Sequence, residues 1–268
     1  MGIELRGRTV LKAQKTVRRF LLPAMLALPL LTCGPPDSHE RVVLITIDSL
    51  RPDRMTAYGG PVSLMPHLDE LAQRGVVFKQ ASTAAPLTFP SLAGIMTGQP
   101  PSQVGVVDDR GSILSSRFPR LAPRLLDGGW ATGAFVNDPD LDTNCGLMEG
   151  FRRVFNPAAE TRARTESAAD LFNEALDFLD HHRRLASFAW IHVHDTHYPY
   201  LGPGVSGHGE ERYNTALTAA DRALGVFLEG LEQKDLLKDA MIIVTADHGE
   251  GLGQTGEQTH GLWLNPPT

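Results

Sequence analysis

The chain has 268 residues, of which 42% are hydrophobic and 21% are charged, so it is long enough for one large α/β domain or two small ones. This ordinary globular composition argues against a disordered chain or a repeat array. The net charge of −6 argues against nucleic acid as a partner, because phosphate backbones attract basic surfaces.

The first 32 residues differ from the rest and are typical of an export signal. A basic region precedes the uncharged run of residues 20–31, which contains two prolines and is short for a membrane-spanning helix. Cys33 follows Leu30, Leu31 and Thr32, as in bacterial lipoprotein signals, where the cysteine is lipidated and becomes the new N-terminus. Thr32 departs from the Gly, Ala or Ser usual at that position, so a plain secretory signal or an uncleaved anchor is the alternative.

We therefore expect a signal peptide over residues 1–32, an acylated Cys33 and a linker over residues 33–41. Removing residues 1–32 takes away six basic residues and one acidic residue, which leaves a net charge of −11. That charge suits an exported periplasmic or cell-surface domain held at the membrane by one lipid rather than by basic patches. If Cys33 is acylated, Cys145 has no partner in the chain, so no internal disulfide is expected.

Beyond the linker, apolar strand patterns alternate with amphipathic helix patterns. The run of residues 42–47 is continuously apolar and β-branched, which is typical of a strand buried on both faces. The alternation predicts an α/β fold with a mostly parallel central sheet and helices on both faces. The expected strands span residues 42–47, 76–79, 131–136, 188–193 and 241–245, and the expected helices span residues 66–74, 90–96, 120–126, 165–179 and 217–231.

Candidate metal ligands come directly after two of these strands. Asp48 follows the first strand, and Asp247 and His248 follow the last one. In a parallel sheet, sites form at the carboxyl ends of the strands, so these side chains are expected to lie together. Carboxylate and imidazole groups suit a divalent metal, although an acid after a strand is also a common helix cap or turn former.

Thr88 is the candidate nucleophile, because Pro90 fits the first turn of a helix and places Thr88 at the helix N-terminus. A capping threonine is the structural alternative. In the catalytic interpretation, the hydroxyl attacks an anionic ester whose oxygens face the free N–H groups of the helix. A threonine hydroxyl needs a base or a metal for this, and Asp48, Asp247 and His248 could hold the metal.

A second polar group includes His192, Asp195 and His197 at the end of the fourth strand, together with His260 in a glycine-rich loop. A polar strand end on the surface and a solvent-exposed loop histidine are the structural alternatives. Imidazoles placed beside the Thr88 site would bind and neutralise an anionic substrate.

At this point the sequence resembles the sulfatase and alkaline phosphatase superfamily over roughly residues 42–261. The resemblance is carried by five ordered motifs, at residues 43–69, 85–98, 195–200, 221–225 and 245–250. It implies that residues 42–268 form a sulfatase-like catalytic domain. It also implies a C-terminally incomplete domain, because the family continues past the His248-Gly249 motif into a further subdomain.

Departures from the sulfatases proper point to the phosphoester branch of the superfamily. Thr88 stands where sulfatases carry the cysteine or serine that becomes formylglycine, and threonine cannot form that group. Leu92 replaces a typical arginine, and His260 matches a position that is commonly lysine. The resemblance implies one metal site and a second metal or phosphate site, for one or two ions of Zn, Mn or Ca. The first site would contain Asp48, Thr88, Asp247 and His248, and the second His192 or Asp195, His197 and His260.

The expected function is hydrolysis or transfer of an anionic ester, with Thr88 and His197 as catalytic residues and a phosphothreonine intermediate. The resemblance implies an anionic ester substrate, such as a lipid or glycan of the cell envelope. A sulfuric ester hydrolase of the same fold is the first alternative. A degenerate, non-catalytic envelope binding protein is the second.

Overall fold

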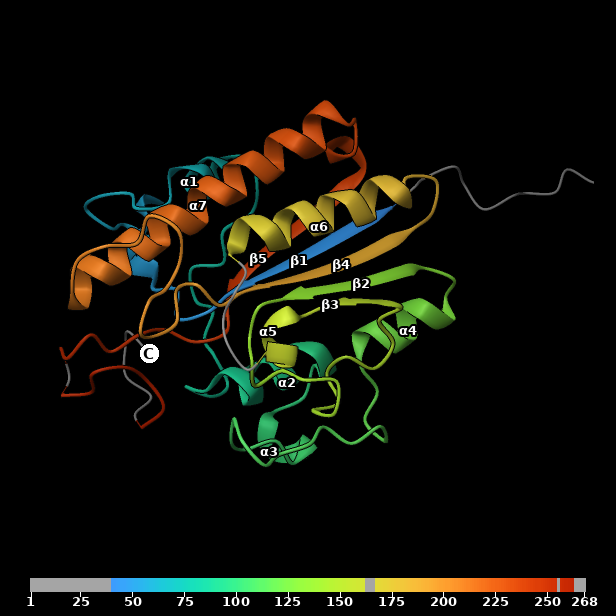
Figure 1. The fold of residues 1–268 in the computed structure, drawn as a ribbon, viewed down its shortest axis with the longest axis horizontal. Helices are drawn as coiled ribbons and strands as arrows, with labels where there is room; N and C mark the ends of the chain where they lie inside the picture. The colour runs from blue at the N-terminus through green and yellow to red at the C-terminus, as the bar shows by residue number, and fades with distance from the viewer. Residues whose placement is uncertain (1–39, 162–166, 255, 263–268) are drawn as a thin grey trace, which may run out of the picture. The chain divides into compact units, whose positions relative to one another are not determined.

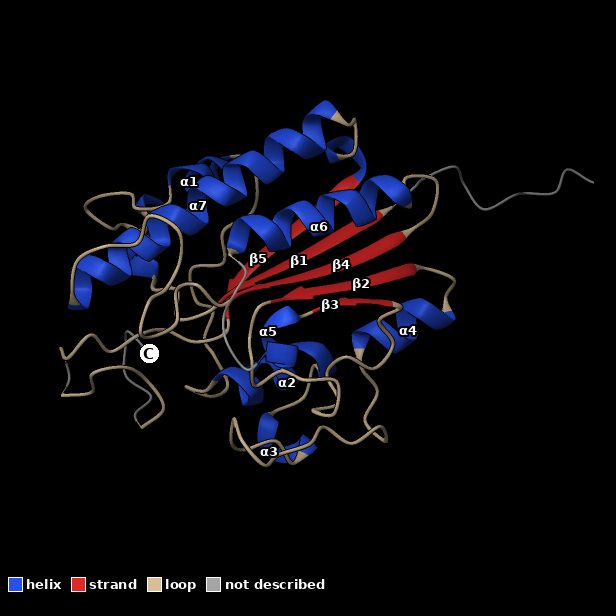
Figure 2. Ribbon diagram, viewed as in Figure 1, coloured by secondary structure: helices blue, strands red, loops and turns tan. Residues whose placement is uncertain are grey.

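Five parallel strands form one sheet, in the order β3-β2-β4-β1-β5 (Figures 1 and 2). The computed structural model describes residues 40–161, 167–254 and 256–262. The predicted α/β class with a parallel sheet is confirmed. The strands are β1 (Arg41–Ile47), β2 (Ala131–Val136), β3 (Arg153–Phe155), β4 (Ser187–Val193) and β5 (Ala240–Ala246).

Helices cover both faces of the sheet, as Figure 1 shows. One face packs against α1 (Pro66–Gln73), α6 (Ala168–His181) and α7 (Gly209–Gln233). The other face packs against α2 (Thr88–Thr97), α3 (Pro101–Val104) and α4 (Leu121–Asp127). The short helix α5 (Pro157–Thr161) follows β3, and 3-10 turns span Pro52–Arg54, Thr56–Tyr58 and Leu237–Asp239.

The alternation of side chains along β1 explains why its sequence is apolar at neighbouring positions. Val43, Ile45 and Ile47 point into the core shared with α6 and α7. Leu44 points into the opposite core, beneath α2. Because successive residues of a strand face opposite sides of the sheet, a strand with helices on both sides is apolar at every position.

One predicted strand is absent from the described part of the chain. Residues 76–79 follow α1 as a loop, with Val76 and Phe78 exposed at 82% and 72%. An apolar, β-branched segment becomes a strand only where it pairs with another strand, and residues 76–79 pair with none of the five strands of the described sheet. The remaining predicted elements are present, although α7 begins earlier, at Gly209, and β3, α3 and α5 had no clear sequence signal.

The N-terminal predictions lie outside the described residues. Contacts divide the chain into residues 1–37 and 38–268, and the structure describes only part of the second unit. The signal peptide over residues 1–32, the lipidated Cys33 and most of the linker therefore stay predictions. No helix in the described ranges has the length and apolar character to cross a membrane.

Candidate metal centre and nucleophile

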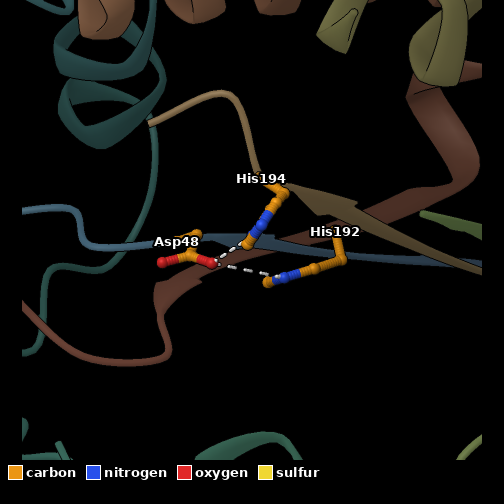
Figure 3. A group of neighbouring side chains, drawn as sticks. All are labelled: Asp48, His192 and His194. Atoms are coloured by element: carbon orange, nitrogen blue, oxygen red, sulfur yellow. Dashed lines mark hydrogen bonds and ion pairs between the residues drawn. The ribbon is translucent and has the colours of Figure 1, made fainter. Parts of the chain in front are cut away.

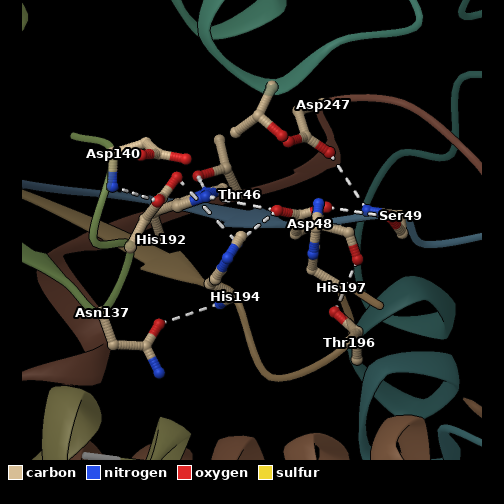
Figure 4. Close-up of polar contacts among 12 residues, drawn as sticks. Thr46, Asp48, Ser49, Asn137, Asp140, His192, His194, Thr196, His197 and Asp247 are labelled. Atoms are coloured by element: carbon tan, nitrogen blue, oxygen red, sulfur yellow. Dashed lines mark hydrogen bonds and ion pairs between the residues drawn. The ribbon is translucent and has the colours of Figure 1, made fainter. Parts of the chain in front are cut away.

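The strand register brings the candidate site residues to one edge of the sheet. Ile47 of β1 pairs with Val193 of β4 on one side and with Ala246 of β5 on the other. The next residue of each strand is therefore at the same level, and these residues are Asp48, His194 and Asp247 (Figure 4). Asn137, which directly follows β2, lies at the same edge.

Asp48 is the centre of this group and is fully buried. Its Oδ2 lies 2.6 Å from Nδ1 of His194 and 3.7 Å from Nε2 of His192. Its Oδ1 accepts a hydrogen bond from the Ser49 hydroxyl at 2.9 Å and lies 3.7 Å from Nε2 of His248. Burial by itself raises the pKa of Asp48, but the neighbouring imidazoles outweigh it and hold that pKa well below its usual range.

Asp247 is buried beside Asp48, and its two carboxylate oxygens differ in their hydrogen bonding. Oδ1 accepts hydrogen bonds from the backbone N–H groups of Ser49 and His248, at 3.2 and 2.7 Å. Oδ2 is buried and has no hydrogen-bond partner. Burial, followed by the negative charge of Asp48, raises the pKa of Asp247 well above its usual value. A cation between the two carboxylates would remove this conflict.

Thr88 is the first residue of α2, and its hydroxyl faces His248. Oγ1 lies 3.1 Å from Nε2 of His248, whose Nδ1 lies 2.9 Å from the carbonyl oxygen of Gly249. Because a carbonyl only accepts, Nδ1 carries the proton and Nε2 presents its lone pair to Thr88. Burial lowers the pKa of His248 to about 3. The imidazole is therefore neutral and available as a ligand or hydrogen-bond acceptor.

Ser91, one turn into α2, connects this helix to the segment after β5 that contains Asp247 and His248. Its hydroxyl donates to the carbonyl oxygen of Asp247 at 2.6 Å. Together with the Thr88–His248 contact, this bond sets the N-terminus of α2 against the end of β5. Leu87 is the N-cap of α2 and no side chain caps the helix, so the Thr88 hydroxyl is directed to His248 and not to the helix backbone.

Two groups of ligand atoms in the described residues could each hold a metal ion. They are Asp48, Asp247 and His248, and Asp48, His192 and His194, with the atoms of each group within 4.8 Å of one another. The first group is the one expected from the sequence, and Thr88 lies against it. The second contains His192, as expected, but its partner His194 was not among the predicted ligands.

The predicted ligands His197 and His260 extend the site by ring contacts. The His197 ring stacks on His194 with centroids 4.4 Å apart and meets His260 at 4.9 Å. His260 also lies 4.1 Å from the His248 ring. Burial opposes protonation of His260, but the carboxylates of Glu250 and Asp48 raise its pKa above the ordinary value. His197 and His260 therefore lie on the side of His248, the histidine that Thr88 contacts.

Asp195, another predicted ligand, is directed elsewhere. Its Oδ2 accepts a hydrogen bond from the Asn137 amide at 2.8 Å, and its Oδ1 accepts one from the backbone N–H of Ala168 at 3.1 Å. Ala168 is the first residue of α6, where a carboxylate is favoured by the helix dipole. This placement favours a structural role for Asp195, and neither ligand group in the described ranges contains it.

Three residues near the site were missed by the sequence interpretation. His194 follows β4 directly, as Asp48 follows β1, so the same positional argument could have found it. Asn137 follows β2 and accepts the backbone N–H of His194 at 2.9 Å. Asp109 lies in an irregular loop and accepts the N–H of Phe89 at 2.8 Å, beside the candidate nucleophile. Nothing in the local pattern around Asp109 indicates that contact.

Several solved structures share this fold, among them a protein of the alkaline phosphatase superfamily. A superfamily protein from Vibrio parahaemolyticus is similar with a TM-score of 0.66 and 24% identity, over 78% of this chain and 54% of that one. Phosphonate monoester hydrolase of Agrobacterium radiobacter is similar with a TM-score of 0.67 and 20% identity, over 85% of this chain and 66% of that one. The C-terminal periplasmic domain of EcEptC from Escherichia coli, in complex with Zn, is similar with a TM-score of 0.66 and 18% identity. The match covers 85% of this chain and 69% of that one. At these identities the likeness shows the fold.

The chain belongs to the sulfatase family, whose model matches residues 40–265. N-acetylgalactosamine-6-sulfatase of Rattus norvegicus is 25% identical over 299 aligned positions, covering 91% of this chain and 55% of that protein. Ectonucleotide pyrophosphatase/phosphodiesterase family member 3 of Mus musculus is 25% identical over 233 positions, covering 81% and 26%. The chain spans about half the length of the sulfatase relatives it matches. The resemblance stated from the motifs is thus confirmed.

Proposed function

We propose that this chain is a metal-dependent hydrolase or transferase of anionic esters, with Thr88 as its nucleophile. One observation carries the proposal. The Thr88 hydroxyl lies 3.1 Å from Nε2 of His248, at the edge of a buried group whose other members are Asp48 and Asp247. A capping threonine needs no such surroundings, whereas a nucleophile needs activation by a base or a metal.

The residues fit a divalent cation. The unpartnered Oδ2 of Asp247, the carboxylate of Asp48 and the Nε2 lone pair of His248 converge beside the Thr88 hydroxyl. An imidazole among oxygen ligands suits Zn or Mn better than Ca, which prefers an all-oxygen shell. Such an ion would supply positive charge and lower the pKa of the threonine hydroxyl.

The chain's own groups then have separate tasks. Thr88 loses its hydroxyl proton to solvent as Oγ1 forms a bond to the phosphorus or sulfur atom, and the ester bond to the leaving group breaks. The leaving group takes up a proton, and water or an acceptor hydroxyl later releases the enzyme-bound group and restores the Thr88 hydroxyl. His197 and His260 lie beside His248 and would stabilise the charge of the non-bridging oxygens. The N-terminus of α2 directs its dipole toward the same oxygens.

Phosphate esters are the proposed substrates, and a phosphodiester or a phospholipid headgroup is the proposed class. Thr88 has no route to the formylglycine of sulfatases, which favours the phosphoester branch. Sulfate esters are the alternative, favoured by the names of relatives such as the rat sulfatase. A glycan or lipid of the cell envelope would be reached by the exported, lipid-anchored form that the N-terminal sequence predicts.

The test compares Thr88→Ala and Thr88→Ser with the unaltered chain, using bis(p-nitrophenyl) phosphate and p-nitrophenyl sulfate with Mn or Zn supplied. We expect faster turnover of the phosphate. We also expect a loss of several orders of magnitude in Thr88→Ala with the metal retained, and partial activity in Thr88→Ser. Full activity of Thr88→Ala would remove Thr88 from the mechanism, and a preference for the sulfate would identify the other branch.

A further inference from the structure

The segment after β1 turns at Ser49, and this turn contacts both carboxylates of the candidate metal centre. Ser49 has a φ of 57°, in the left-handed region that a residue with a Cβ adopts only at a cost in free energy. Its hydroxyl donates to Oδ1 of Asp48 at 2.9 Å, and its N–H donates to Oδ1 of Asp247 at 3.2 Å (Figure 4). One strained residue is therefore connected to both acids.

The position of the Asp48 carboxylate is closely defined by the imidazoles around it. Oδ2 lies 2.6 Å from Nδ1 of His194 and 3.7 Å from Nε2 of His192, and Figure 3 shows both rings directed at this carboxylate. Oδ1 lies 3.7 Å from Nε2 of His248. Because metal–ligand distances are defined to about 0.2 Å, a small rotation of the turn at Ser49 would move Asp48 out of a ligating position.

A buried tyrosine from α7 holds this turn. Tyr213 is 0% exposed and lies 164 positions from Ser49 in the chain. Its hydroxyl donates to the carbonyl oxygen of Ser49 at 2.7 Å and accepts the backbone N–H of Arg51 at 3.1 Å. Buried backbone groups need partners of this kind. The two hydrogen bonds lie on either side of Leu50, so a single hydroxyl bridges both ends of the turn.

The backbone that Tyr213 contacts is also connected to the loop after β5. Nη1 of Arg51 donates to the carbonyl oxygen of Glu250 at 2.8 Å, two residues beyond His248. Nε and Nη2 of Arg51 donate to the carboxylate of Asp53, at 3.0 and 2.8 Å, and the Arg51 side chain is only 4% exposed. The Tyr213 hydroxyl therefore bears on the segments that follow both β1 and β5.

We propose that Tyr213 is a positioning residue for the candidate metal centre. Its hydroxyl keeps Ser49 in the left-handed conformation, and that conformation directs Asp48 and the Ser49 N–H into the site. Tyr213 belongs to the core between α7 and the sheet, so the packing of this helix is linked to metal affinity through one hydroxyl. The inference rests on the proposed function for the presence of the metal, and it uses no step assigned to Thr88.

The experiment measures the dissociation constant of zinc without any assay of turnover. Tyr213→Phe removes the hydroxyl and keeps the ring, so it tests the two hydrogen bonds alone. The full chain is stripped of metal, and zinc binding is followed by competition with a chromophoric chelator. We expect Tyr213→Phe to raise the dissociation constant by about tenfold, as is typical when a group that orients a ligand is lost.

Tyr58→Phe is the matched control. The Tyr58 hydroxyl also donates to a backbone carbonyl, that of Phe78 at 3.2 Å, but this contact is exposed and lies outside the site. The control should therefore leave the dissociation constant unchanged. An unchanged constant in Tyr213→Phe as well, in a chain that does bind zinc, would overturn the positioning role.

Substitutions of Ser49 separate positioning from general destabilisation. Ser49→Ala and Ser49→Gly both remove the hydroxyl, but only glycine adopts a positive φ without a steric cost. We expect Tyr213→Phe to weaken zinc binding about tenfold when combined with Ser49→Ala and only about twofold when combined with Ser49→Gly. An equal loss in the two combinations would show that the conformation of Ser49 has no part in the effect.

Circular dichroism checks that each variant is folded. If Tyr213→Phe does not fold, either alone or combined with Ser49→Gly, Tyr213 is a general structural residue and the proposal is wrong. Failure of the proposed function is a different result, because Thr88→Ala would then keep full turnover whatever the dissociation constants of zinc.

Discussion

Two buried carboxylates face the same small space at the end of β1 and β5. Asp48 and Asp247 are both fully buried, and their ligand atoms lie within 4.8 Å of each other. Like charges this close raise the pKa of one partner, here Asp247, behind the larger effect of burial. Such an arrangement destabilises the metal-free fold and strengthens cation binding. A cation bound between these carboxylates would therefore stabilise the folded state.

We therefore predict that Asp247→Asn changes thermal stability in opposite directions in the absence and in the presence of metal. The amide oxygen can still accept the two backbone N–H groups that Oδ1 accepts now, and the new NH₂ can face Asp48. In excess chelator we expect the variant to be as stable as the unaltered chain or more stable, by about 1 kcal/mol. With saturating zinc, the unaltered chain should melt at the higher temperature.

Thermal unfolding with and without chelator checks this prediction, and Asp177→Asn, an exposed carboxylate on α6, is the control. The control should leave both midpoints nearly unchanged. A variant that melts below the unaltered chain in chelator by several degrees would show that Asp247 is a structural turn former.

At the scale of elements, the connection between β1 and α1 depends on one buried carboxylate. Asp69 of α1 accepts hydrogen bonds from the backbone and hydroxyl of Thr56, at 3.0 and 2.8 Å, and from the N–H of Ala57, at 2.8 Å. Burial alone would raise the pKa of Asp69, but the hydrogen bonds outweigh it and lower that pKa. The carboxylate therefore holds the Thr56–Tyr58 turn against α1.

We predict that Asp69→Asn lowers the free energy of unfolding by about 1–2 kcal/mol at pH 7. A depressed folded-state pKa means that the contribution is fully present above the unfolded value, near 4, and is lost as the pH falls through the folded value. The difference between variant and unaltered chain should therefore shrink at pH 3. Urea unfolding at the two pH values measures it. A difference that stays constant with pH would mean that the charge of Asp69 has no part in it.

Another feature at this scale is the open side of β5. This strand pairs only with β1 in the described sheet, and its Met241 and Ile243 are exposed at 62% and 42%. The helices α2 to α4 pack on the same face farther along, over β2 and β4. Apolar side chains of β5 are therefore covered on only one face of the strand, the face toward α7.

At the scale of the whole molecule, the position of the site depends on topology more than on any one helix. Three parallel strands, β4, β1 and β5, end at the same level, and each is followed by a residue of the site. This is the general position of sites in parallel α/β sheets. His197, which follows β4, and His260, in the glycine-rich loop, complete it. These two residues are 63 positions apart in the chain and meet through a ring contact.

The N-terminal sequence leads to a prediction for the whole protein in a bacterial cell. If Cys33 is lipidated after cleavage, the protein should sediment with the membrane fraction, and Cys33→Ser should move most of it to the soluble exported fraction. Cys145→Ser is the control, because Cys145 is a buried free cysteine of the described domain and has no place in the signal. Membrane association that survives Cys33→Ser would point to an uncleaved anchor.

The sequence by itself determined most of the helices and strands and the positions of the candidate ligands Asp48 and Asp247 at the ends of β1 and β5. Continuous apolar strands are readable locally, because both of their faces are buried, and Asp48 and Asp247 then follow at the strand ends. The helix start at Thr88 was readable to within two residues because Pro90 fits the first turn. The motifs added the family, which the family model confirms.

Only the tertiary structure decided which polar groups face one another. His194 joined Asp48 because the register pairs Ile47 with Val193, whereas Asp195, the next residue, turned toward the N-terminus of α6. Adjacent residues at a strand end point in different directions, and long-range packing selects the partner of each. For the same reason residues 76–79 stayed a loop, since a strand requires a neighbour that the local sequence does not specify.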